Sequence, residues 1–184
     1  MSGPARQAGR FVDDAGRTVT WSMAEGRRGR RWRWAVADRT ATAIVAHTLE
    51  LDPTGGFSRL ESASGTGLLT LHREADGSIH GNRVTERGGD HLWIPAPAPE
   101  RALVGSGPLG AVALVTNLEV GDGGATFEVL EVSDDLGVQV TGCSVDRRDR
   151  GAWEVKTDLG VRRADVTAAG LPHRMGATWP LEEV

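Results

Sequence analysis

The sequence predicts an all-β protein, in which antiparallel meanders curl into a β-roll or half-open barrel with a concave cavity and one or two short helices. Turn signals recur about every eight to twelve residues, and 25 of the 184 residues are glycine. No long window carries apolar residues at helical spacing over three or four turns. A curled sheet of this kind turns one face towards solvent and the other towards a core or a cavity.

The composition is that of an ordinary soluble globular protein. Hydrophobic residues make up 39% and charged residues 25%, and the net charge of −4 gives no electrostatic reason to expect nucleic acid. The single cysteine, Cys143, excludes an internal disulfide. Because no apolar segment resembles a signal peptide or a membrane span, we expect a cytoplasmic protein without stable membrane insertion.

The first part of the chain, over residues 17–94, predicts a meander of antiparallel strands separated by short turns. The expected strands are Arg17–Trp21, Arg31–Val36, Thr40–Leu51, Phe57–Ser62, Leu68–His72, Ile79–Thr85 and His91–Ile94. A proline-rich connector follows over residues 95–109, because proline cannot donate the hydrogen bond that a central strand needs.

A second meander is expected over residues 110–168. Its strands are Ala111–Val120, Thr126–Val132, Gly137–Gly142, Ala152–Thr157 and Val161–Val166. The last of these could equally be a short helix that ends at Gly170. Residues 169–184 are expected to form a surface coil. Two meanders joined by a connector predict two sheet halves that face each other within a single domain over residues 1–184.

Strand alternation assigns the aromatic residues of the first meander to one face. Trp32 and Trp34 share a face, and in the next strand His47 lies in an otherwise apolar row with Val45 and Leu49. His47 is either a core histidine bonded to a neighbouring carbonyl or hydroxyl, or a polar group that orients a ligand in an apolar pocket.

A second row on the next strand carries charge. Strict alternation places Phe57, Arg59 and Glu61 on one face. Arg59 and Glu61 can then pair with each other or with cross-strand neighbours. A carboxylate that faced a cavity could instead act as a general acid or base. A surface ion pair is the favoured interpretation.

The stretch HREADGSIH predicts a hairpin whose register depends on its turn. With a three-residue loop over 75–77, His72 lies opposite His80. With a two-residue Asp-Gly turn, His72 lies opposite Gly81. In either register, His72 lies on the more polar face of its strand.

The basic run Arg27–Arg33 is a local exception to the acidic balance. Its sequence, within GRRGRRWRW, can contact phosphates or acidic lipid headgroups. It can equally solvate a strand edge and protect it from pairing with another chain. Edge strands that do pair would form a homodimer.

Neither a metal nor a cofactor is expected. His72, His80 and His91 fall on separate strands without ligand spacing. No nucleophile elbow, P-loop or dinucleotide fingerprint is present, since GSGPLG over 105–110 lacks the preceding strand and following helix. Cys143 at a strand end is typical of a free cysteine that packs as a small hydrophobe.

Several stretches carry a family resemblance. They are RWRWAVADRTATAIVAHTLEL followed by FSRL, then LLTLHREADGSIHGN, GPLGAVALVTNLEVGDG and EVKTDLGV. Their order is similar to that in the bacterial putative glycolipid-binding proteins, a family of unknown function with a spiral β-roll fold. The resemblance covers most of Val19–Ala168, and it implies a β-roll that binds a hydrophobic ligand.

These features predict that the protein binds a hydrophobic or amphipathic small molecule, lipid-like or glycolipid-like, in a β-roll cavity. Aromatic walls suit apolar or sugar surfaces. The candidate ligand-binding residues are Trp32, Trp34, His47, Arg59 and Trp93.

The alternative is a small cofactor-independent enzyme of the isomerase or cyclase type. It would act on a hydrophobic intermediate in the same cavity through a few acid–base groups. The candidate catalytic residues are His47, Glu61 and His72.

Overall fold

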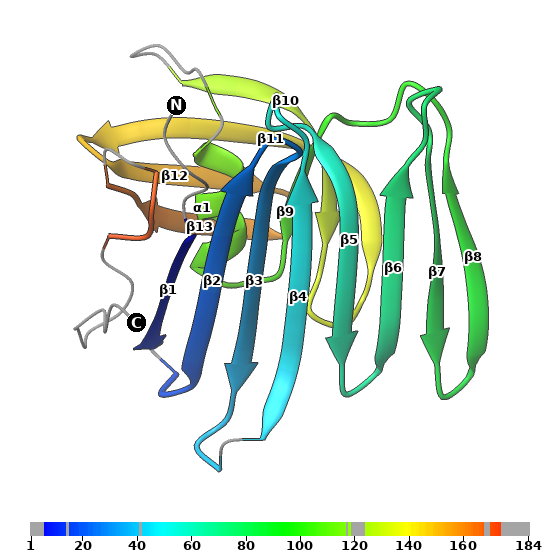
Figure 1. Cartoon of the computed structure of the whole chain (residues 1–184), viewed down its shortest axis with the longest axis horizontal. Helices are drawn as coiled ribbons and strands as arrows, with labels where there is room; N and C mark the ends of the chain where they lie inside the picture. Colours follow the sequence, from blue (N-terminus) through cyan, green and yellow to red (C-terminus); the bar gives the residue numbers. More distant parts are fainter. Residues whose placement is uncertain are drawn as a thin grey trace. The chain divides into compact units, whose positions relative to one another are not determined.

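The computed structural model describes residues 6–13, 15–40, 42–116, 118, 124–167 and 170–173. Within them the chain forms two compact units, one holding the described residues up to Ala98 and the other those from Pro99 onwards (Figure 1). Each unit is built on one β-sheet, so the all-β prediction is confirmed. The boundary between the units falls inside the predicted connector over 95–109.

The first unit is an eight-stranded antiparallel sheet whose strands follow one another in chain order. Its strands are β1 (Arg6–Val12), β2 (Thr18–Gly26), β3 (Gly29–Ala37), β4 (Ala43–Leu51), β5 (Phe57–Ser64), β6 (Gly67–Arg73), β7 (Ile79–Thr85) and β8 (Gly88–Ile94). The sequence predicts β7 with its observed bounds but does not predict β1. Most of β1 is exposed, so it lacks the apolar alternation by which a strand is recognised.

The β2–β3 hairpin ends in a tip of two arginines. Gly26 and Gly29 pair across the ladder, which leaves Arg27 and Arg28 as the turn. Gly29 has a φ of +106°, and a Cβ there would lie 2.0 Å from the carbonyl oxygen of Leu51. Glycine is therefore required at position 29 for the hairpin to present both arginines at the end of the sheet.

The two faces of this sheet differ in character. One face is apolar and buried, and its members on β2 to β7 are Val19, Trp21, Met23, Trp32, Trp34, Val45, His47, Leu49, Leu51, Phe57, Leu60, Ser62, Leu69, Leu71 and Ile79. The other face is polar and mostly exposed. This division is the usual one for an antiparallel sheet that has a core on one side only.

Strand β5 breaks the alternation near its start. Its ladder with β4 shifts register there, so Ser58 is an extra residue in the strand. Phe57 is fully buried, whereas Arg59 and Glu61 are exposed. The prediction that Phe57, Arg59 and Glu61 share a face is wrong, because strict alternation does not continue through a β-bulge.

The β6–β7 hairpin has the three-residue loop. The backbone N–H of Glu74 donates to the carbonyl oxygen of Ser78 at 2.9 Å, which closes the loop over 75–77. His72 consequently lies opposite His80, as that register predicts.

The second unit is a five-stranded sheet, in the order β13-β12-β11-β10-β9, with one described helix. Its elements are β9 (Arg101–Val104), α1 (Pro108–Val115), β10 (Ala125–Val132), β11 (Val138–Asp149), β12 (Ala152–Thr157) and β13 (Gly160–Asp165). Strand β9 pairs parallel to β10, and the other neighbours are antiparallel. The connector predicted over 95–109 therefore contains a strand. The prediction that GSGPLG over 105–110 lacks a preceding strand and a following helix is wrong, because β9 ends directly before it and α1 begins within it. Of the two alternatives for Val161–Val166, the strand is observed.

Helix α1 replaces the first part of the strand predicted over Ala111–Val120. Its residues from Leu109 to Val115 are all buried, so no amphipathic period marks them as helical. Pro108 in the first turn is the sequence signal that favours a helix start. Among the residues that the structure describes, no helix has both the length and the apolar character needed to cross a membrane.

The predicted C-terminal coil over 169–184 lies outside the described residues except for 170–173. In that short stretch, the backbone N–H of His173 donates to the carbonyl oxygen of Asp165 at 2.8 Å. Pro172 forms an isolated bridge with Val166. Residues 170–173 are therefore attached to the end of the second sheet.

Candidate functional site

The first sheet gathers three tryptophans and a histidine on its apolar face. Trp34 lies between Trp21 and His47 in one cross-strand row. The ring centroids of Trp34 and His47 are 4.9 Å apart, and those of Trp21 and Trp32 are 6.1 Å apart. All four side chains are buried, so the predictions that Trp32 and Trp34 share a face and that His47 lies in an apolar row are confirmed.

His47 is hydrogen-bonded within the same face. Its Nδ1 lies 2.8 Å from Oγ of Ser62 on the neighbouring strand, and both side chains are buried. This is the arrangement expected of a core histidine bonded to a neighbouring hydroxyl. It also brings an imidazole and a serine hydroxyl together in apolar surroundings.

Trp32 contributes a polar atom that is not satisfied. Its indole Nε1 is buried and has no hydrogen-bond partner among the described residues. Buried indole N–H groups usually find an acceptor, and an unmet buried donor costs about 1–3 kcal/mol. The apolar face therefore holds a buried donor without an acceptor among the described residues.

The other predicted residues lie on the opposite face of the sheet. Arg59 and Glu61 form an ion pair of 2.6 Å in which both side chains are about half exposed, so the surface ion pair is confirmed. Nε2 of His72 lies 2.8 Å from Oε1 of Glu74, again at the surface. Trp93 is 62% exposed. The predicted ligand-binding set is thus divided, with Arg59 and Trp93 on the exposed face.

The three candidate catalytic groups do not converge. His47 lies on the buried face, whereas Glu61 and His72 lie on the exposed face. The thickness of the sheet separates the imidazole of His47 from the other two groups. The structure therefore does not support one acid–base site built from all three.

Three histidines lie next to one another on the exposed face. The ring centroids of His80 and His72 are 6.4 Å apart, and those of His80 and His91 are 5.7 Å apart. Within the described ranges, no three or more His, Cys, Asp or Glu side chains are placed to hold a metal ion. The histidines are cross-strand neighbours without the geometry of a ligand set.

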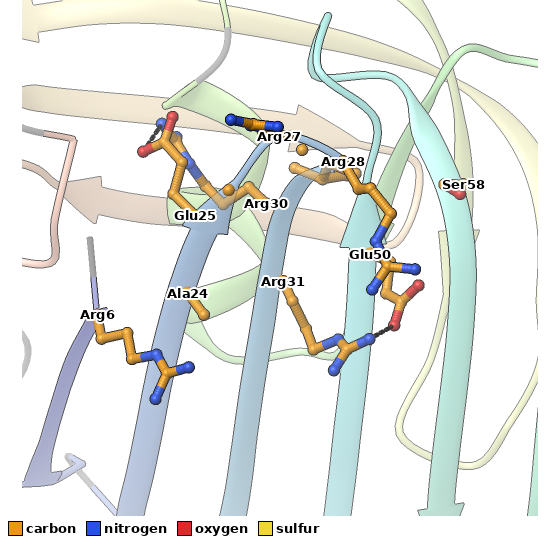
Figure 2. A pocket seen from close by; sticks show the side chains of 12 residues that line it. Arg6, Ala24, Glu25, Arg27, Arg28, Arg30, Arg31, Glu50 and Ser58 are labelled. Atoms are coloured by element: carbon orange, nitrogen blue, oxygen red, sulfur yellow. Dashed lines mark hydrogen bonds and ion pairs between the residues drawn. The ribbon is translucent and has the colours of Figure 1, made fainter. Parts of the chain in front are cut away.

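A hollow of about 580 Å³ lies at the hairpin end of the first sheet (Figure 2). Its charged lining consists of Arg6, Arg27, Arg28, Arg30, Arg31, Glu25 and Glu50. Arg6 on β1 and Arg31 on β3 flank Ala24 on β2 in one cross-strand row. The small side chain of Ala24 leaves the space between the two long ones open. The sequence indicates the basic run but cannot reveal that β1 adds Arg6 to it.

The arginines of the hollow differ in how they are paired. Nη2 of Arg30 lies 3.0 Å from Oε2 of Glu25, and Nη2 of Arg31 lies 2.5 Å from Oε1 of Glu50. Among the five arginines that line the hollow, Arg6, Arg27 and Arg28 form neither an ion pair nor a side-chain hydrogen bond with a described residue. Three guanidinium groups around one hollow are therefore not neutralised.

The second unit contains a buried ion pair that the sequence does not predict. Nη2 of Arg162 lies 2.8 Å from Oε1 of Glu131, and the two side chains are 8% and 0% exposed. Thr157 Oγ1 donates to the same carboxylate at 2.9 Å, and Nε of Arg162 donates to the carbonyl oxygen of Gly105 at 3.0 Å. Arg162 is on edge strand β13 and Gly105 follows the other edge, β9, so the sheet curls into a half-barrel. The signal in the sequence is a glutamate inside the apolar run VLEV.

Cys143 is buried in the middle of β11, so the prediction that it lies at a strand end is wrong. Burial, and then the charge of Glu131, raise the pKa of its thiol to about 11. The side chain is therefore a neutral thiol near neutral pH, which agrees with a packed small hydrophobe and not with a nucleophile.

The comparisons with known proteins identify a similar fold. No family model matches this chain, and no curated protein matches it. The crystal structure of a DUF1089 family protein from Pseudomonas aeruginosa is similar, with a TM-score of 0.52 and 15% sequence identity. The match covers 97% of this chain and 92% of that chain. At this identity, the similarity extends to the fold alone.

Proposed function

We propose that the protein binds a hydrophobic or amphipathic small molecule, of a lipid-like or glycolipid-like kind, against the apolar face of the first sheet. The observation that carries the proposal is the buried indole Nε1 of Trp32, which has no acceptor among the described residues. A ligand with an apolar body and one ester, carbonyl or hydroxyl oxygen would meet both the donor and its apolar surroundings.

The neighbours of Trp32 support an apolar ligand. Leu49 lies opposite Trp32 on one side and Met23 on the other, and the ring of Trp21 is close by. Ligand sites are mostly apolar, with a few polar groups that fix orientation. In this face those groups would be Nε1 of Trp32 and the hydrogen-bonded pair of His47 with Ser62.

Native mass spectrometry of the purified protein, followed by thermal-shift assays with a panel of lipids, tests the proposal. We expect a co-purified hydrophobic molecule and a rise in Tm with the lipids that bind, since a ligand stabilises the state that it binds. The variant Trp32→Phe keeps a ring but removes the donor. Its affinity should fall roughly twofold to tenfold, as expected for one hydrogen bond.

The matched control is Trp93→Phe, because Trp93 is exposed on the other face. This variant should keep the affinity of the unmodified protein. Two results would contradict the proposal. One is the absence of any co-purified or added lipid that binds, and the other is an equal loss of affinity in both variants.

A second candidate is the small enzyme acting on a hydrophobic intermediate at the same face. The observation that favours it is the 2.8 Å contact between Nδ1 of His47 and Oγ of Ser62. This contact holds one acid–base group, the imidazole of His47, in apolar surroundings. If the co-purified molecule is converted on incubation, His47→Gln should abolish conversion and retain binding. Conversion that survives in His47→Gln would exclude this candidate.

A further inference from the structure

We infer that the arginine-lined hollow at the β2–β3 hairpin binds a phosphate-type oxyanion, carried by a soluble phosphorylated compound or by a lipid headgroup. Of the apolar face, the lining of the hollow includes Leu51 but neither Trp32 nor His47, and the inference does not depend on the function proposed above. It assigns a ligand class to a surface that the apolar-ligand proposal does not use.

The hollow has the size of a small-molecule site. Its volume of about 580 Å³ lies within the range of roughly 300–1,000 Å³ that such sites occupy. Figure 2 shows Arg6 on one side, Arg27 and Arg28 at the hairpin end, and Arg31 on the other side. A group bound in the hollow would thus be approached by guanidinium groups from more than one direction.

The charge of the hollow opposes the charge of the whole protein. Its lining has five arginines and two glutamates, an excess of three positive charges in a chain whose net charge is −4. Arg6, Arg27 and Arg28 have no carboxylate partner in the described chain, so their charges are not neutralised by the protein. An oxyanion bound in the hollow would supply the missing negative charge. The planar guanidinium fork also matches phosphate oxygens, to which it can donate two hydrogen bonds at once.

A second hollow adjoins the first and extends the basic surface. It has a volume of about 510 Å³ and shares Arg6, Ala24 and Arg31 with the first hollow. Arg33 joins its lining, which includes no acidic residue among those described. Two adjoining basic hollows favour a ligand that carries more than one anionic group, such as a diphosphate.

The surrounding surface favours a small ligand over a nucleic acid. Further along the same face, Arg59 on β5 is bracketed by Glu50 and Glu61, so the positive charge does not continue across the sheet. Nucleic-acid binding needs an extended basic stripe or patch that follows the backbone. The basic residues here are confined to β1, β3 and the hairpin between β2 and β3.

Calorimetric titration of the whole chain with pyrophosphate at constant ionic strength tests the site. Flotation with vesicles of phosphatidylcholine, alone or mixed with an equal part of phosphatidic acid, tests the lipid source. Titration with a single-stranded RNA oligomer tests the nucleic-acid alternative.

The test variant replaces both tip residues, Arg27→Gln and Arg28→Gln, which are exposed and should leave the fold intact. The matched control is Arg87→Gln, because Arg87 occupies the exposed tip of the β7–β8 hairpin.

Binding of pyrophosphate, or of the acidic vesicles but not the neutral ones, supports the inference if the double variant weakens it and the control does not. We expect affinity to fall roughly tenfold for each arginine removed, as for a charge-assisted hydrogen bond. Binding to pyrophosphate identifies a soluble source, and binding to acidic vesicles alone identifies a headgroup. The inference is overturned if neither probe binds, if the double variant binds as well as the control, or if RNA binds more tightly than both.

Discussion

Arginine has opposite surroundings in the two units. In the second unit, Arg162 is buried, paired with Glu131 and bonded to the carbonyl oxygen of Gly105. In the first unit, Arg27 and Arg28 are exposed at a hairpin tip without a described partner. A buried guanidinium is tolerated only where its charge is paired and its N–H groups have acceptors. Arg162 therefore links β13 to the segments that supply Glu131 and Gly105. An exposed and unpaired guanidinium contributes little to folding and remains available to a ligand.

The largest effect should come from breaking the buried pair. Arg162→Met leaves the carboxylate of Glu131 without its charged partner, so we expect a loss of about 3–5 kcal/mol in the free energy of unfolding. Urea denaturation followed by circular dichroism measures it. The double variant Arg162→Met with Glu131→Leu removes both charges and should recover much of the loss. A single variant that unfolds at the same urea concentration as the unmodified protein would remove the contrast between the two units.

A smaller effect should follow from changing the backbone that presents the exposed arginines. Gly29→Ala places a Cβ against the carbonyl oxygen of Leu51 and imposes a φ of +106° on a residue with a side chain. We expect a destabilisation of about 1–3 kcal/mol, measured by the same denaturation. Gly26→Ala is the control, because a Cβ there meets nothing within 4 Å. Equal effects of the two substitutions would mean that the close approach at Gly29 is unimportant.

The exposed arginines themselves should matter little for stability. We expect the double variant of Arg27→Gln and Arg28→Gln to change the free energy of unfolding by no more than about 0.5 kcal/mol. Thermal denaturation in buffer without polyvalent anions measures the change. A loss comparable to that of Arg162→Met would show that the hairpin arginines are structural, which contradicts the comparison.

The smallest effect should arise from an exposed charge cluster in the second unit. Side-chain hydrogen bonds from Arg148 and then Lys156 lower the pKa of Glu154 from 4.5 to about 2. A folded pKa below the unfolded one stabilises the protein above pH 4.5, and this contribution is lost as the pH falls from 4.5 towards 2. The free energy of unfolding of Glu154→Gln, measured by denaturation at a series of pH values, should therefore change slightly less between pH 4.5 and pH 2 than that of the unmodified protein. The same profile in both proteins would mean that the cluster has no role in acid stability.

Much of the fold can be predicted because its first sheet obeys simple alternation. Trp32, Trp34 and His47 fall on one face in the sequence pattern and in the structure. The pattern fails where a local event interrupts it. Ser58 adds one residue to β5, and α1 is apolar all round, so neither a period of two nor a helical period can identify them.

The candidate sites are harder to predict because they depend on pairing between distant segments. The basic run contains Arg27, Arg28 and Arg31, but Arg6 joins them only because β1 pairs with β2. Arg162 and Glu131 are 31 positions apart in the numbering, and they meet because the second sheet curls. A single sequence shows where a charged residue stands in an apolar run or where arginines cluster, but it does not show which of these residues contact one another in the fold.

The bulge at Ser58 has a consequence for how changes in β5 are read. Upstream of the bulge, Phe57 lies on the buried face, and downstream of it the odd-numbered positions Arg59 and Glu61 face solvent. A deletion of Ser58 would remove the extra residue and place Phe57 directly before Arg59. Regular alternation would then keep Phe57 buried and Arg59 and Glu61 exposed without any inversion of the strand. When homologues of this chain are aligned, a gap at this position should therefore leave the polarity on both sides of it unchanged.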